Sequence, residues 1–183
     1  MSSSPTSGIP TSLLRRLTPW RRMVAATLTV AVADAAFAFI AYVLVAGRYN
    51  FETLLQYIAS GVTGDAAFAS GWAGVGYAAL GFGIHLALSA AFVVVYALVI
   101  APLVRTPIVA SAVGLLYGAL IWMFMNAVVL PLGRSTREQF FNGYYTAFLI
   151  DHAVLVGLPI ALIMLGAYAG SRGASVPSAP SAQ

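Results

Sequence analysis

Four long apolar stretches decide what this chain can fold into. One has no charged residue from Trp72 to Val104, and another runs from Ala147 to Gly170 with Asp151 and His152 near its start. Each of the four reaches the about 20 residues that a helix needs to cross the core of a bilayer. The sequence therefore predicts an all-α protein, a four-helix transmembrane bundle.

The composition supports a membrane protein. Of the 183 residues, 61% are hydrophobic and 8% are charged, too few to cover a globular surface with polar side chains. The nine basic residues are all arginines at the ends of apolar stretches, which is a pattern of membrane topology and not of nucleic-acid binding. The absence of cysteine excludes disulfides and thiolate metal sites.

The domain organisation follows from the apolar stretches. Residues 15–170 are predicted to form one membrane domain, with spans at about 23–47, 76–102, 107–131 and 147–170. Residues 1–14 and 171–183 are rich in Ser and Pro and are predicted to be disordered tails. A rival interpretation takes the first span as a signal peptide that is cleaved partway along it. The apolar run, however, continues past the possible cleavage site to full bilayer length.

The arginines also predict an orientation. Loops that stay inside carry an excess of Arg and Lys. Six arginines then lie inside and three outside, with both termini in the cytoplasm: Arg15, Arg16, Arg21, Arg22, Arg105 and Arg172 inside, and Arg48, Arg134 and Arg137 outside.

Residues 48–71 form the first outside loop and contain an amphipathic pattern. Apolar side chains recur there at helical spacing, Asn50 suits the cap, and Gly61 suits the end. We expect a short helix that either lies on the outer leaflet or packs on top of the bundle.

Two series of small residues favour close helix packing. Ala79, Gly83, Ala87 and Ala91 form the first, and Ala110, Gly114 and Gly118 form the second. Such faces let helices approach closely within one chain, in a homo-oligomer or against another membrane protein.

Five polar residues lie inside the predicted spans. A helix rises ~1.5 Å per residue, which places Asp34 near the bilayer centre, where no His or Arg is expected at its depth. We therefore expect its carboxyl to be protonated or hydrogen-bonded to Tyr117 or Ser89. The other four are expected to meet nearer the outer side: His85, Asn126, Asp151 and His152.

Three interpretations of these residues stay open. They hold the bundle together by hydrogen bonds, they bind a small ligand or relay protons at the outer face, or His85 and His152 hold a metal ion or haem in an electron-transfer bundle. Because neighbours on a helix point about 100° apart, only one of Asp151 and His152 is expected to face inward. We predict that it is His152, while Asp151 either caps the cluster from the rim or pairs with Arg134 or Arg137 in the adjoining loop.

The stretches AFASGWAGVGYAALGFGIHLALSA and YGALIWMFMNAVVLPL, with the Arg-led first span, resemble small bacterial inner-membrane proteins of the YagU type. This resemblance implies a multi-pass protein of the inner membrane and carries over no catalytic residue or cofactor. No nucleophile elbow, P-loop or HExxH motif is present, so we expect a protein without enzymatic activity and without a bound cofactor.

Overall fold

The computed structural model describes residues 18–47, 49–135 and 141–168. These residues are helical apart from short connections and contain no strand. In chain order the helices are α2 (Pro19–Ala38), η1 (Phe39–Val45), α3 (Phe51–Thr63), η2 (Gly64–Phe68), α4 (Gly71–Val95), η3 (Tyr96–Ile100), α5 (Pro107–Phe124), η4 (Met125–Val129), α6 (Leu130–Leu132), α7 (Phe141–Asp151), η5 (His152–Gly157) and α8 (Leu158–Met164).

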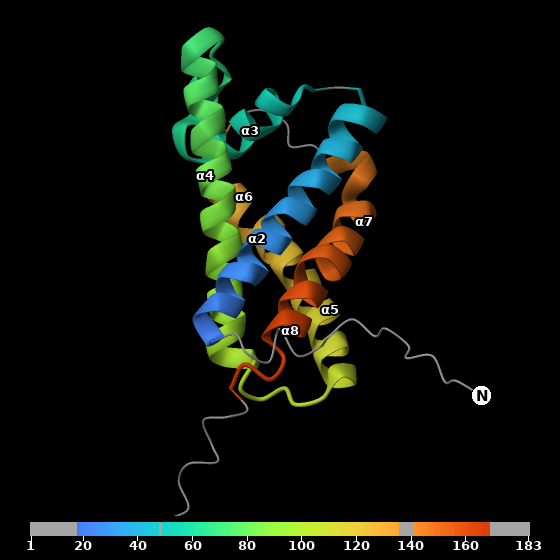
Figure 1. The fold of residues 1–183 in the computed structure, drawn as a ribbon. Coiled ribbons are helices and arrows are strands. Elements are labelled where there is room, and N and C mark those ends of the chain that lie inside the picture. Colours follow the sequence, from blue (N-terminus) through green and yellow to red (C-terminus); the bar gives the residue numbers. More distant parts are fainter. Residues whose placement is uncertain (1–17, 48, 136–140, 169–183) are drawn as a thin grey trace, which may run out of the picture.

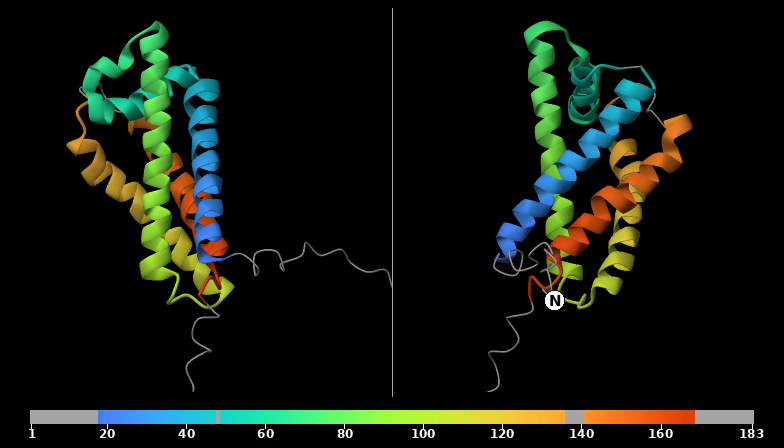
Figure 2. Two further views of the ribbon diagram at one scale, coloured as in Figure 1. Left: turned by 60° about the vertical axis from the view of Figure 1, so that its left-hand side comes forward. Right: turned by 45° about the vertical axis from the view of Figure 1, so that its right-hand side comes forward.

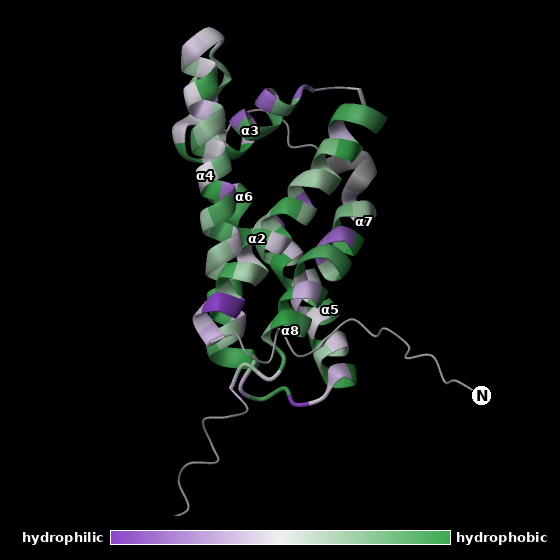
Figure 3. Ribbon diagram, in the orientation of Figure 1, coloured by the Kyte–Doolittle hydropathy of each residue, from purple (hydrophilic) through white to green (hydrophobic). Residues whose placement is uncertain are grey.

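Four helical stretches are long and apolar enough to cross a membrane, which confirms the predicted fold class. They are Pro19–Val45, Gly71–Ile100, Pro107–Leu132 and Tyr145–Met164. Most residues along these stretches are hydrophobic (Figure 3). The fourth helix ends at Met164 and not at 170, because Leu165 leaves the helical conformation and Gly166 has a φ of 73°. Both predicted tails lie outside the described residues.

The spanning helices form an irregular bundle (Figures 1 and 2). α4 stands along one side, α2 crosses the bundle obliquely, and the α7–α8 stretch packs between α2 and α5. The start of α2, the end of α8 and the α4–α5 connection lie at one end, and α3 lies across the other end.

Arg22 ties the first spanning helix to the last. Its guanidinium donates hydrogen bonds to the carbonyl oxygens of Ile163 and Leu165, where α8 ends. Those carbonyls have no partner inside their own helix, and a cation suits the negative end of the helix dipole. The side chain is 4% exposed, so this arginine is part of the folded core as well as a topology signal.

Glycines bring α5 against the fourth span. A Cβ on Gly114 would lie 2.7 Å from the Cβ of Ala161, and a Cβ on Gly118 would clash with the backbone of His152. From the other side, a Cβ on Gly157 would clash with the backbone of Gly114 and Gly118. The second predicted small-residue face is therefore a helix contact within the chain.

The first series of small residues does not make such a contact. Ala79, Gly83, Ala87 and Ala91 are all exposed, and a Cβ on Gly83 would meet no atom within 4 Å. α4 instead packs on α3 with a different face, where a Cβ on Gly81 would clash with the backbone of Leu55. Spacing alone does not say which small residues on a helix meet a neighbour.

α3 is the amphipathic helix predicted for the first outside loop, and it packs on the bundle. The Asn50 side chain accepts a hydrogen bond from the Thr53 amide at 2.8 Å, as a cap does. The helix passes Gly61 and ends at Thr63, followed by Gly64 with a φ of 69°. Gln56 is buried and donates to the carbonyl oxygen of Ala69, which holds α3 to the start of α4.

Two groups of buried apolar side chains fill the bundle. One includes Ala26 and Val30 of α2 together with Val156 and Ile160 of the last span. The other includes Ala41 and Tyr42 of η1 and Phe148 of α7. On both helices the sequence between these groups is polar, at Asp34 and at Asp151–His152. The polar residues therefore lie between two apolar layers, near the middle of the spanning helices.

Candidate functional site

The candidate site is centred on the carboxylate of Asp34. Its Oδ2 lies 3.7 Å from His85 Nδ1 of α4, and its Oδ1 lies 3.8 Å from His152 Nδ1 of η5. Both distances exceed direct hydrogen-bond length, so a water or a small movement must complete each contact. We call Asp34, His85, Asp151 and His152 the polar cluster.

The hydrogen bonds of His85 define its tautomer. Its Nε2 lies 3.0 Å from the carbonyl oxygen of Ala31, one helical turn before Asp34. A carbonyl oxygen only accepts, so Nε2 carries a hydrogen. In the neutral imidazole, Nδ1 then presents a lone pair toward Asp34. Two acceptors face each other there unless a proton or another cation lies between them.

His152 has the opposite arrangement. Its Nδ1 lies 3.0 Å from the carbonyl oxygen of Phe148 and 3.1 Å from Asp151 Oδ2. Both neighbours are acceptors, so Nδ1 carries the hydrogen. This hydrogen is donated to the Phe148 carbonyl of the same helix, while Asp151 Oδ2 lies beside it outside good hydrogen-bond geometry and Asp34 Oδ1 lies farther away, at 3.8 Å.

Asp151 is the most buried acid among the described residues. Its side chain has no exposed area, and neither carboxylate oxygen makes a hydrogen bond of good geometry. The Oδ2 contact to His152 Nδ1 is its only ion pair in the described part of the chain. A buried carboxylate without hydrogen bonds is costly in an apolar interior, so this group needs a proton or a cation nearby.

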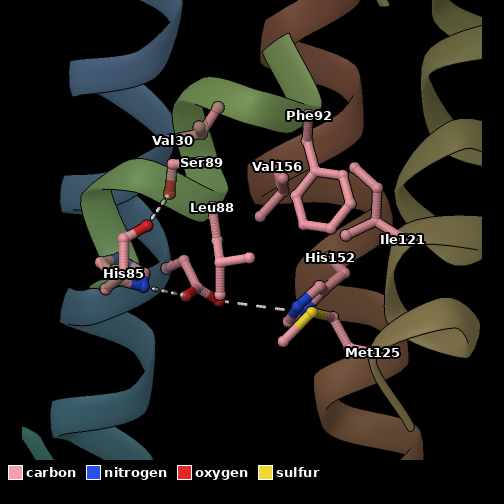
Figure 4. A pocket seen from close by; sticks show the side chains of 10 residues that line it. Val30, His85, Leu88, Ser89, Phe92, Ile121, Met125, His152 and Val156 are labelled. Atoms are coloured by element: carbon pink, nitrogen blue, oxygen red, sulfur yellow. Dashed lines mark hydrogen bonds and ion pairs between the residues drawn. The ribbon is translucent and has the colours of Figure 1, made fainter. Parts of the chain in front are cut away.

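A small cavity lies beside the cluster. It has a volume of about 70 Å³ and is lined by Asp34, His85, Ser89 and His152 together with apolar side chains. We call it the polar cavity. Figure 4 shows the two imidazoles on opposite sides of it, each joined by a dashed line to the carboxylate between them. This volume accommodates a few water molecules, each of which occupies about 30 Å³ in the liquid.

The charges of the cluster do not balance with neutral imidazoles. Two carboxylates face two histidines, and none of the described arginines lines the cavity. In the low dielectric of a membrane interior, two neighbouring negative charges repel strongly. The arrangement therefore favours taking up protons or another cation, and it does not favour anions.

The structure brings Asp34 into the cluster, contrary to the sequence-based expectation. Asp34 is 12 residues after Arg22, and His152 is 11 residues before Ile163. Arg22 binds the carbonyl of Ile163, so these two residues lie at the same level. Asp34 and His152 each lie about 17 Å along their helices from that level. The expectation that no histidine lies at the level of Asp34 was therefore wrong, because the height of each helix is set by contacts with its neighbours and not by its own sequence.

Other predicted contacts are not formed. Asn126 donates to the carbonyl oxygen of Trp122 in its own helix and does not line the polar cavity. Ser89 donates to the carbonyl of His85, and Tyr117 donates to the carbonyl of Phe92, so neither is a hydrogen-bond donor to Asp34.

Asp151 also lies elsewhere than predicted. It is buried beside His152 and not at the rim with Arg134, while Arg137 lies outside the described residues. Oxygen or nitrogen atoms of Asp34, Asp151 and His152 lie within 4.8 Å of one another, so both neighbours reach the same point. The helix changes from α to π geometry between Asp151 and His152, which places successive side chains closer in angle than in an α-helix.

The ligand types in the cluster suit a metal ion better than haem. Two carboxylates and an imidazole converge, a set that binds divalent ions. Bis-histidine haem ligation needs two imidazoles facing each other across a porphyrin, whereas here a carboxylate lies between them and the cavity is about 70 Å³. The residues therefore do not fit the haem that the sequence left open.

Comparison with known proteins found no matching family model, no matching curated protein and no matching solved structure. The resemblance to YagU-type proteins stays a prediction.

Proposed function

We propose that this protein binds and exchanges protons at the polar cluster inside the membrane. The observation that carries the proposal is the position of Asp34, whose two carboxylate oxygens face imidazoles on two other helices. Ionisable residues inside membranes mark proton and ion pathways in many transporters. The cavity beside Asp34 has room for a bridging water across the 3.7 and 3.8 Å separations.

The cluster supports a transfer route between helices. A proton on Asp34 has His85 Nδ1 on one side, while the Nδ1 hydrogen of His152 lies on the other. Movement of the carboxyl by less than 1 Å, or one intervening water, brings either imidazole within hydrogen-bond length. Imidazole gains and loses protons near neutral pH, which suits a relay.

The experiment is proton flux into proteoliposomes under an imposed membrane potential, followed with an internal pH dye. Asp34→Asn keeps the size of the side chain and removes its proton-carrying group. We expect it to lower flux at least about tenfold, as removal of an acid–base group does. The matched control is Asp65→Asn at an exposed outer acid, which should leave flux unchanged. Equal flux from wild type and Asp34→Asn, or no flux above empty liposomes, contradicts the proposal.

A second candidate function is binding of a divalent metal ion. It is favoured by the convergence of Asp34, Asp151 and His152 within 4.8 Å. Titration of the chelator-treated protein with Zn²⁺ in a calorimeter tests it, and Asp151→Asn should weaken binding at least about tenfold. Wild-type protein that binds no Zn²⁺ removes this candidate and leaves the proton proposal standing.

We also infer that the protein lies in a bacterial inner membrane, with both termini in the cytoplasm and without enzymatic activity. The six-to-three division of arginines between the two sides supports this orientation. Reporter fusions after Arg105 and Gln183 should report the cytoplasm, and a fusion after Gly133 the periplasm. A periplasmic C-terminus would contradict the orientation.

A further inference from the structure

A second, larger cavity lies next to the polar cluster. It has a volume of about 380 Å³ and is lined mainly by apolar side chains of α3, α4, η4 and α6, among them Leu54, Ile58, Ile84 and Val129. Its volume is in the range of about 300–1,000 Å³ that small-molecule sites occupy. We call it the apolar cavity.

The two cavities share part of their walls. Leu88 of α4 and Met125 of η4 line both the polar cavity and the apolar cavity. Figure 4 shows Met125 beside His152, and Leu88 between His152 and His85. Met is flexible and adapts its shape to what packs against it, so this boundary is a soft one. A molecule in the apolar cavity is therefore separated from the polar cavity, where the carboxylate of Asp34 lies, by a wall one side chain thick.

The charged groups beside the two cavities favour a cationic ligand. Asp34 lines the polar cavity, and the buried Asp151 beside it has two carboxylate oxygens without hydrogen bonds. None of the described arginines lines either cavity. A bound molecule with a positive charge finds a complementary group there, whereas an anion meets one or two carboxylates in a low dielectric.

We propose that the two cavities form one binding site for a lipophilic cation, a molecule with an apolar body and a single positive charge. The apolar body occupies the space between α3, α4 and η4, and the charge lies against Asp34 beyond Leu88 and Met125. This inference rests on the proposed function, because it gives the ligand class of the same cluster. A lipid acyl chain is the alternative occupant, and it would bind without regard to charge.

The test is equilibrium binding of radiolabelled tetraphenylphosphonium to the purified full-length protein in detergent. Tetraphenylborate, an anion of nearly the same shape, is the matched probe. Wild type should bind the cation saturably at one site and bind the anion at least about tenfold more weakly, because only the cation complements Asp34. Equal binding of both probes would show an apolar or lipid site and would overturn the proposal.

Two variants separate the contribution of the carboxylate from that of the apolar cavity. Asp34→Asn should lower the affinity for the cation at least about tenfold. Ile84→Trp should lower it by filling the apolar cavity, and Leu80→Trp, an exposed position one turn earlier on α4, is the control that should bind as wild type does. Unchanged binding in Asp34→Asn, or equal binding in the two Trp variants, would overturn the proposal. Size-exclusion profiles check that each variant is folded.

Proton flux distinguishes this inference from the function on which it rests. If wild type conducts protons but binds neither probe, the lipophilic-cation inference fails alone. If wild type binds the cation as expected but conducts no protons, the proton proposal fails alone. Loss of probe binding in Ile84→Trp with proton flux retained supports both, because that residue lines the apolar cavity and not the polar one.

Discussion

Arg22 shows how one side chain acts at a membrane boundary in more than one way. It belongs to the basic group that predicts an inside N-terminus, yet it is buried and binds the end of α8. Its neighbour Arg21 is exposed and lies over the ring of Trp20. Sequence treats the two arginines alike, while the structure gives only one of them an anchoring role.

We predict that Arg22→Met destabilises the protein by about 2 kcal/mol. The change keeps much of the side chain's apolar length and removes the charged hydrogen bonds to the partly buried carbonyls of Ile163 and Leu165. Arg21→Met removes the same charge from an exposed side chain and should change stability by less than about 0.5 kcal/mol. Unfolding in increasing SDS, followed by circular dichroism, measures both. Equal destabilisation of the two variants would contradict the anchoring role of Arg22.

The last span shows how an irregular element places the site. α7 gives way at His152 to the π-helical η5, and α8 begins at Leu158 just before Pro159. Proline has no amide hydrogen, so it cannot complete the helical hydrogen bond to the turn before it, and π geometry accommodates such a break. Pro159 is therefore next to the segment that presents Asp151 and His152.

We predict that Gly118→Ala and Gly83→Ala differ sharply, although both are glycines inside spanning helices. A Cβ at Gly118 would clash with the backbone of His152, which cannot move aside as a flexible side chain does. Overpacking of this kind costs about 1–3 kcal/mol. A Cβ at Gly83 meets nothing within 4 Å, so that change should be neutral or stabilise by up to about 1 kcal/mol.

The measurement is again SDS unfolding, with both variants prepared in parallel. Gly118→Ala should also disturb the site, because the clash is with the residue that carries one of the imidazoles. A Gly118→Ala protein as stable as wild type would contradict the close contact of α5 with η5. A destabilised Gly83→Ala would indicate that the exposed stripe of α4 packs against another protein, such as a second copy of the chain.

At the scale of the whole molecule, the site exists because three spanning helices bring their middles together. Contacts at the end of the bundle where α2 begins, such as Arg22 with the end of α8, and the glycines of α5 fix the relative height of the helices. His85 is then joined to α2 through the carbonyl of Ala31. The height and rotation of each helix, and not any local motif, decide that Asp34 lies between two histidines.

We predict that cysteines at 85 and 152 crosslink with a short thiol reagent in this cysteine-free chain. His85 and His152 lie on opposite sides of the same carboxylate, so their replacements face each other across the cavity. The control pair is 87 and 152, because Ala87 is exposed on the outer face of α4. Gel mobility after treatment reads out the result. Crosslinking of the control pair, or of neither pair, would contradict the arrangement of the cluster.

The sequence by itself determined the elements of this protein. Apolar length defined four spanning helices, Asn50 and its amphipathic pattern defined α3, and Gly114 with Gly118 marked a close helix contact. These features depend on local chemistry: the thickness of a bilayer, the free amides at a helix start, and the absence of a side chain.

Only the tertiary structure decided which polar residues meet. Asp34 joined His85 and His152, while Asn126 bonded within its own helix and the small residues from Ala79 to Ala91 faced outward. Depths counted along the separate spans placed Asp34 away from both histidines, whereas its carboxylate lies 3.7 and 3.8 Å from their imidazoles. Residues on different helices meet according to helix ends, rotation and relative height, and these are fixed by contacts distant in the chain, such as Arg22 with Ile163.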